Sequence, residues 1–105
     1  MSVIMTLRMS VDAEVWERTA AEHAEAIGRV MEIAKSHGLI GHRWYGRDGE
    51  VMAADEWPAP ENFQAFFEEA QPQIGPLMEA AGITSQPDVT FWQQLDIDDA
   101  YGWGA

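Results

Sequence analysis

Two hydrophobic periods alternate along this chain, and their order limits the possible folds more than any other sequence feature. Apolar residues recur at every second position, as in half-buried strands, in segments 3–9, 39–45, 51–57 and 88–97. They recur every three to four positions, as in amphipathic helices, in segment 13–36 and again from Pro60 onward. The predicted order is therefore strand, helix, strand, strand, helix, strand.

Helix-breaking residues set the expected ends of the two helices. Gly38 follows the first apolar stripe, so we predict one helix over about 13–36. Pro60 suits the first turn of the second helix. Pro72 and Pro76 interrupt the stripe of that helix, so we expect a break there, followed by a short further helix.

The order of elements is that of a ferredoxin-like α+β fold, a four-stranded antiparallel sheet with its helices on one face. The segment Gly46-Arg47-Asp48-Gly49 supplies turn residues for a hairpin between the second and third strands. The 105 residues suffice for one core. We therefore expect a single domain over 1–97 and a C-terminal tail over 98–105.

The sheet face without helices is also predicted to be apolar. Four residues of the alternating strands fall on it: Ile4, Met52, Ala54 and Trp92. A large exposed apolar face on a small domain indicates a binding partner. The simplest partner is a second copy of the chain, so we predict a homodimer with its two sheets face to face.

Charge is distributed unevenly along the sequence. Eighteen acidic and six basic residues give a net charge of −12, and every base lies at or before Arg47. This excess of acid argues against binding to nucleic acid or to an anionic membrane surface. We further predict that the acidic C-terminus meets the basic second strand of the partner, near Arg43 and Arg47.

Several classes of site are not expected in this chain. The sequence contains no cysteine, which excludes disulfides, thiolate metal sites and a cysteine nucleophile. Apolar runs are too short for a membrane span, and no secretory signal is visible, so a cytoplasmic location is predicted. No phosphate loop or metal-ligand spacing occurs, and neither a metal nor a cofactor is expected.

Three stretches of sequence resemble a known superfamily: Ala53 through Pro58, the helix beginning Pro60-Glu61-Asn62-Phe63, and Pro76 through Gly82. Together with the element order, they resemble the dimeric α/β-barrel proteins, and within them the antibiotic-biosynthesis-monooxygenase-like group. The resemblance spans roughly residues 3–97. It implies two sheets that pack into a barrel across a dimer, with a small cavity between the helices and sheet of each subunit.

The superfamily contains cofactor-independent monooxygenases, isomerases, haem-binding enzymes and proteins without known activity, so the fold alone does not select a reaction. The haem-degrading branch carries a histidine on the second helix. This chain has Phe63, Phe66 and Phe67 there, which makes haem binding a distant third hypothesis.

His23 is the first candidate for a chemical role. It falls in the middle of the apolar stripe of the long first helix, between Trp16 and Ile27. A polar ring in that position needs a hydrogen-bond partner or a cavity. We therefore name His23 as the candidate acid–base residue, against the alternative of a histidine satisfied at the edge of the core.

Four further residues are candidates for ligand binding. Alternation sends His42 and Trp44 to one face of the second strand and Tyr45 to the other, and one of these faces meets the cavity. The resemblance implies that Trp57 forms an aromatic wall at the cavity edge. Asp55 and Glu56 are adjacent, point to opposite faces, and are not a paired-carboxylate site.

The leading hypothesis is a homodimer that binds a small apolar or aromatic molecule, with cofactor-independent monooxygenase or isomerase activity. The alternative is a non-catalytic dimer of the same fold, in which these residues serve only the core and the interface. A cavity of a few hundred cubic ångströms reaching His23 would favour the first hypothesis.

Overall fold

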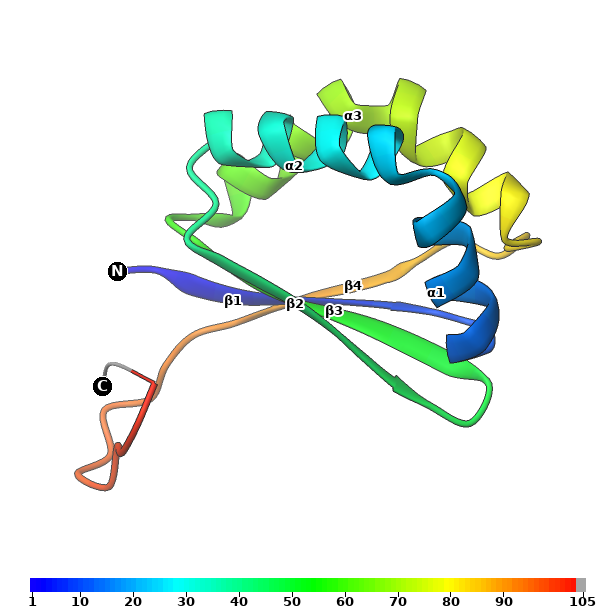
Figure 1. Cartoon of the computed structure of the whole chain (residues 1–105). Coiled ribbons are helices and arrows are strands. Elements are labelled where there is room, and N and C mark those ends of the chain that lie inside the picture. Colours follow the sequence, from blue (N-terminus) through cyan, green and yellow to red (C-terminus); the bar gives the residue numbers. More distant parts are fainter. Residues whose placement is uncertain (104–105) are drawn as a thin grey trace.

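A computed structural model describes residues 1–103 of the chain. Its elements are β1 (Val3–Met9), α1 (Ala13–Glu22), α2 (Ala24–Ser36), β2 (Gly41–Arg47), β3 (Glu50–Trp57), α3 (Pro60–Ala80) and β4 (Asp88–Trp92). The four strands form one antiparallel sheet in the order β2-β3-β1-β4. Helices α2 and α3 lie over one face of this sheet, and α1 lies at its end near the β2–β3 turn (Figure 1). The predicted ferredoxin-like α+β fold is confirmed.

The core lies between the helices and the covered face of the sheet. The central strand β1 pairs with β3 on one side and β4 on the other. Its alternate residues Val3, Met5, Leu7 and Met9 are buried, as the sequence predicted. On the helix side, Phe63, Phe66, Ala70 and Leu77 of α3 close the core.

The first helix is divided at His23, and the prediction of one continuous helix over 13–36 is wrong. His23 has φ −124° and ψ 42°, outside the helical region, and α2 begins at the next residue. The turn lets α1 pack Trp16 against Trp44 of β2, with ring centroids 5.2 Å apart. Meanwhile α2 packs on α3. Tertiary contacts here override an apolar period that runs through both helices.

Helix α3, in contrast, continues through the predicted break. Pro72 and Pro76 lie inside it, four residues apart and both exposed. Each proline removes one backbone N–H donor, but an exposed carbonyl left without that donor can bond to water. The buried positions Phe66, Ala70 and Leu77 keep their helical spacing across the prolines. Packing of this face therefore holds the helix together.

The β2–β3 hairpin turns at Asp48-Gly49, within the predicted turn segment. Gly49 has φ 74°, a left-handed conformation that favours glycine. Strand β2 begins and ends two residues later than predicted, at Gly41 and Arg47. Near its end, a Cβ atom on Gly46 would lie 2.9 Å from the Cβ of Ala13, so the strand and the start of α1 approach closely.

Strand β4 ends at Trp92, and the predicted extension to residue 97 is wrong. The ladder between β1 and β4 ends at the pair of Ile4 and Trp92. Residues 93–103 instead leave the sheet and extend away from the domain (Figure 1). We call them the C-terminal arm. The last two residues of the predicted 98–105 tail lie outside the described part of the chain.

The second face of the sheet has no helix over it. Ile4 is 42% exposed and Trp92 is 55% exposed, and Tyr45 lies on the same face. The indole Nε1–H of Trp92 donates to Thr6 Oγ1 at 2.9 Å. The arm carries four more exposed apolar side chains: Leu95, Ile97, Tyr101 and Trp103. The predicted apolar outer face is present in part: Met52 and Ala54 are half-buried there, and Arg8 and Arg43 pair with them on the same face.

Candidate functional site

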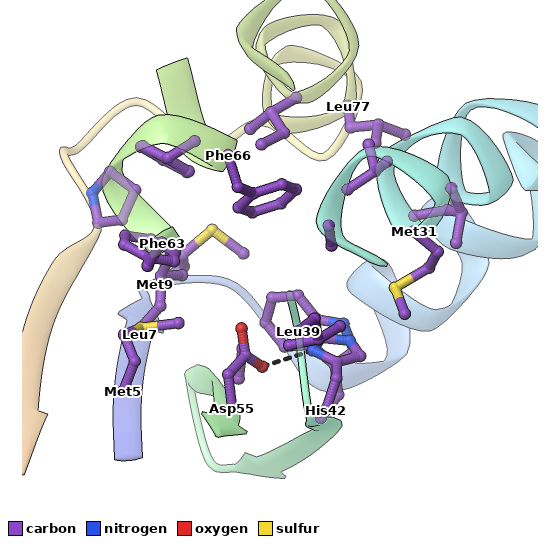
Figure 2. A pocket seen from close by; sticks show the side chains of 18 of the residues that line it. Met5, Leu7, Met9, Met31, Leu39, His42, Asp55, Phe63, Phe66 and Leu77 are labelled. Carbon is purple, nitrogen blue, oxygen red and sulfur yellow. Dashed lines mark hydrogen bonds and ion pairs between the residues drawn. The ribbon is translucent and has the colours of Figure 1, made fainter. Parts of the chain in front are cut away.

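A cavity of about 100 Å³ lies between the helices and the covered face of the sheet. Its walls are mainly the aliphatic and aromatic side chains of β1, α2 and α3, and it is partly open to solvent. Figure 2 shows Met5 and Leu7 on one side, Met31 on the other, and Phe66 and Leu77 on the helix side. The volume is smaller than the few hundred cubic ångströms that would favour the first hypothesis, and the cavity does not reach His23.

One wall of this apolar cavity is polar. His42 of β2 and Asp55 of β3 both line it, and they face each other across the two strands in the sheet register. The His42 Nδ1 atom lies 2.6 Å from Asp55 Oδ1 (dashed in Figure 2). Asp55 Oδ2 accepts a second hydrogen bond at 3.2 Å from the indole Nε1–H of Trp57. We call His42, Asp55 and Trp57 the polar triad.

Burial makes both hydrogen bonds of Asp55 necessary. The residue is only 6% exposed, and a buried carboxylate is costly unless each oxygen has a donor. An ionised carboxylate only accepts hydrogen bonds, so with Asp55 in that form the Nδ1 atom of His42 is the donor of the pair. In the neutral ring, Nε2 is then an unprotonated acceptor, and the described residues supply no hydrogen-bond donor to it.

Trp16 and Trp44 form an aromatic wall next to the polar triad. Their rings meet edge to face, and the Trp44 ring lies 5.8 Å from that of His42 at an angle of 90°. Both tryptophans line the cavity and also a wider groove outside it, between α1 and the β2–β3 turn. The pair therefore separates the cavity from this groove.

The structure changes the predicted site. His42 and Trp44 line the cavity, and Tyr45 points to the outer face of the sheet. His23 does not line the cavity: it is exposed at the α1–α2 turn, where its Nδ1 lies 2.9 Å from the carbonyl of Thr19. Its predicted place in the apolar stripe was wrong, because the helix breaks at this residue. Trp57 is fully buried behind Asp55, so it is not the aromatic wall that we expected.

Asp55 was missed by the sequence analysis, although two signals point to it. It shares the covered face of β3 with Val51, Ala53 and Trp57, so a carboxylate occupies a core position. The two-residue turn at Asp48-Gly49 pairs Arg47 with Glu50, and counting back from this pair places His42 opposite Asp55. A buried acid facing a histidine is typical of a built polar site rather than of a solvated surface.

Residues 1–103, the described part of the chain, contain neither a cluster of metal ligands nor a membrane-spanning helix. No group of three or more histidine, cysteine, aspartate or glutamate side chains there could hold a metal ion. Within the same residues, no helix has the length and apolar character needed to cross a bilayer.

Neither the protein-family models nor the curated protein sequences give a match to this chain. Solved structures do match it. A dimeric ferredoxin-like protein from an uncultured marine organism aligns with a TM-score of 0.63 and 14% identity, over 95% of this chain and 93% of the other. An antibiotic biosynthesis monooxygenase aligns with a TM-score of 0.62 and 9% identity, over 90% and 99%.

SnoaB, a cofactor-independent oxygenase from Streptomyces nogalater, also aligns, with a TM-score of 0.59 and 13% identity over 94% of this chain and 98% of that one. At such identities the likeness concerns the backbone, and the function of each protein remains its own. The resemblance seen in the sequence is thus supported by structure: this chain has the fold of the ferredoxin-like proteins that include the antibiotic biosynthesis monooxygenases.

Proposed function

We propose that this protein is a homodimer that binds one small apolar or aromatic molecule in the cavity of each subunit. Cofactor-independent isomerase or monooxygenase chemistry is the activity that we favour for it. The observation that carries the proposal is an apolar cavity with a single polar wall, formed by His42 and Asp55. Binding sites for small molecules commonly combine apolar walls with a few fixed polar groups.

The cavity limits the size and charge of the ligand. Its volume of about 100 Å³ is below the roughly 150 Å³ of an engineered apolar cavity that binds benzene. We therefore expect a molecule of about one small ring. An anionic ligand is disfavoured because Asp55 lines the cavity and the described residues place no arginine or lysine side chain there.

The outer face of the sheet and the C-terminal arm support the dimer. Ile4 and Trp92 lie exposed on the face, and the arm follows Trp92, the last residue of β4 that pairs with β1. Among the similar structures, one is described as a dimeric ferredoxin-like protein. We propose that two sheets pack face to face and that the acidic arm contacts the partner's β2, near Arg43 and Arg47. The cytoplasmic location stays a prediction.

A cavity-filling variant tests the ligand site. Ala34 of α2 is buried and lines the cavity, so Ala34→Leu places three more carbon atoms there. The matched control is Ala24→Leu on the exposed first turn of the same helix. The probe is cyclopentanone, a small neutral ring, and its binding is followed by saturation-transfer NMR. We expect binding to the wild type and to Ala24→Leu, and loss of binding in folded Ala34→Leu.

Equal binding by the two variants would contradict a ligand site in the cavity. The small volume favours the non-catalytic alternative in one respect, because it leaves little room for a larger substrate. The two functions differ in what happens to a bound ligand. In D₂O, a protein that only binds cyclopentanone leaves its C–H bonds unchanged. An enzyme with a working base replaces the hydrogens next to the carbonyl with deuterium.

A further inference from the structure

We propose that His42 is the general base of this cavity and that it removes a proton from a carbon next to a carbonyl group of a neutral, ring-sized ligand. Asp55 and Trp57 act as positioning residues. The inference rests on the proposed ligand site and assigns the chemistry of one wall of it. It replaces His23, which the structure places outside the cavity.

The contact with Asp55 favours one position for the proton on the His42 ring. Asp55 Oδ1 lies 2.6 Å from His42 Nδ1, and an ionised carboxylate at that distance favours the Nδ1–H tautomer because it only accepts. The lone pair of the neutral ring is consequently on Nε2. A general base needs an unprotonated nitrogen in a defined orientation, and a carboxylate partner supplies both conditions.

The carboxylate of Asp55 is itself held in place. Trp57 is fully buried between Asp55 and the phenylalanines of α3, with ring centroids 5.8 Å from Phe63 and 5.3 Å from Phe66. Its indole N–H donates to Asp55 Oδ2. Each oxygen of the carboxylate therefore has its own donor, and the group cannot rotate without losing one. Supporting contacts of this kind are what keep a catalytic side chain in a productive geometry.

Both members of the pair lie on strands rather than on loops. His42 and Asp55 are directly paired residues of β2 and β3, and the short turn at Asp48-Gly49 fixes that register. A shift of β2 by one residue would turn His42 to the outer face, while pairing with β1 would keep Asp55 on the covered face. The folding of the hairpin therefore also assembles the base and its partner.

The surroundings allow the proton to move in and out. The His42 side chain is 22% exposed, whereas that of Asp55 is 7% exposed. His42 thus touches both the apolar cavity and water. An imidazolium formed there is stabilised by the adjacent carboxylate, and it can exchange its new proton with solvent.

The proposed step is balanced within the ligand and His42. The C–H bond next to the carbonyl breaks, an N–H bond forms at Nε2, and the electron pair moves onto the carbonyl oxygen to give an enolate. Return of a proton from the imidazolium restores the ketone. Return to a different carbon of a conjugated enolate would be an isomerisation, which needs no oxidant and no cofactor.

Deuterium exchange tests this step. The wild type is incubated with cyclopentanone in D₂O, and loss of the proton signals next to the carbonyl is followed by NMR. Positioned general bases typically contribute about 10²–10⁴-fold to a rate, so we expect His42→Gln to lose the protein-catalysed exchange by about 100-fold or more. His23→Gln and His37→Gln are controls, since both histidines lie outside the cavity, and they should exchange at the wild-type rate.

A ligand-free measurement tests the positioning residues. The ¹⁵N chemical shifts of the two ring nitrogens of His42 distinguish the tautomers. We expect a protonated Nδ1 and an unprotonated Nε2 in the neutral wild-type ring. In Asp55→Asn the amide can present its N–H₂ group to Nδ1, and the proton should move to Nε2. A structural role alone would not predict this exchange of tautomers.

The outcomes separate the inference from the proposed function. Wild-type protein that binds cyclopentanone without exchanging it would overturn the base and leave the ligand site standing. Wild-type protein that does not bind the probe would contradict both proposals. Exchange that survives in His42→Gln, or a protonated Nε2 in the neutral wild-type ring, would overturn the assignment of His42 in particular.

Discussion

The two faces of the sheet are formed by the same strands but differ in how far their side chains are buried. Met5 is 1% exposed and its neighbour Ile4 is 42% exposed; Trp57 is fully buried and Trp92 is 55% exposed. On the covered face, the apolar residues of β1 and β3 are buried within the subunit, and the carboxylate of Asp55 has two hydrogen-bond partners. On the outer face, comparable residues have no cover. This difference in burial supports the proposed ligand site on the covered face and the proposed dimer contact on the outer face.

The largest effect should come from removing the buried tryptophan. Trp57→Ala deletes a side chain with no solvent exposure and leaves Asp55 without one donor. Core truncations of this size cost about 3–5 kcal/mol. Chemical denaturation should show that loss at every protein concentration. If the loss of stability disappears at high protein concentration, Trp57 acts through the dimer. The covered face would then not be independent of the outer face.

The next effect belongs to the outer face. Trp92→Ala should weaken the dimer by about 2–4 kcal/mol, the range of interface hot spots, because a half-exposed tryptophan would become the centre of the contact. Analytical ultracentrifugation measures the dissociation constant. Glu79→Ala, a substitution at an exposed surface position, serves as the control. An unchanged dissociation constant in Trp92→Ala would remove this face from the interface.

A smaller, more selective effect is expected from Trp57→Phe. Phenylalanine keeps most of the packing against Phe63 and Phe66 but removes the indole N–H that Asp55 Oδ2 accepts. Hydrogen bonds to charged groups contribute about 1.5–3 kcal/mol. Thermal unfolding should show a loss in that range, together with slower cyclopentanone exchange. Wild-type exchange in this variant would indicate that the carboxylate needs only His42 to stay in place.

The smallest effect concerns charge along the arm. Asp98→Asn combined with Asp99→Asn removes two acids that we propose to face the partner's β2. Exposed ion pairs contribute about 0–1 kcal/mol, so the dimer should weaken only slightly at low salt and not at all at high salt. Deletion of residues 98–105 should weaken it further, by removing Tyr101 and Trp103. Unchanged dimerisation after the deletion would contradict a role for the end of the arm.

Much of the fold could be predicted because local signals and packing agree. The alternation of Val3 through Met9 and the Asp48-Gly49 turn each predict the element that forms. The errors occur where tertiary contacts decide. Trp16 reaches Trp44 only because the helix turns at His23, and Pro72 is tolerated only because its side of α3 is exposed. Neither the turn at His23 nor the exposure of Pro72 can be read from the spacing of apolar residues.

The site was predicted in part, and for similar reasons. The alternation of β2 correctly grouped His42 with Trp44, and the structure places both at the cavity. It could not show which acid His42 meets, because that depends on the strand register rather than on residues close in sequence. His23 was misplaced by assuming a continuous helix. The pairing of His42 with Asp55 follows once the register of the hairpin is known.

One NMR titration tests the separation of the two faces most directly. Cyclopentanone is added to ¹⁵N-labelled protein while the ring nitrogens of His42 and the indole Nε1 of Trp92 are observed. We predict that the His42 signals shift and saturate, whereas the Trp92 signal stays unchanged. A shift at Trp92 with none at His42 would place the ligand on the outer face and contradict the central claim.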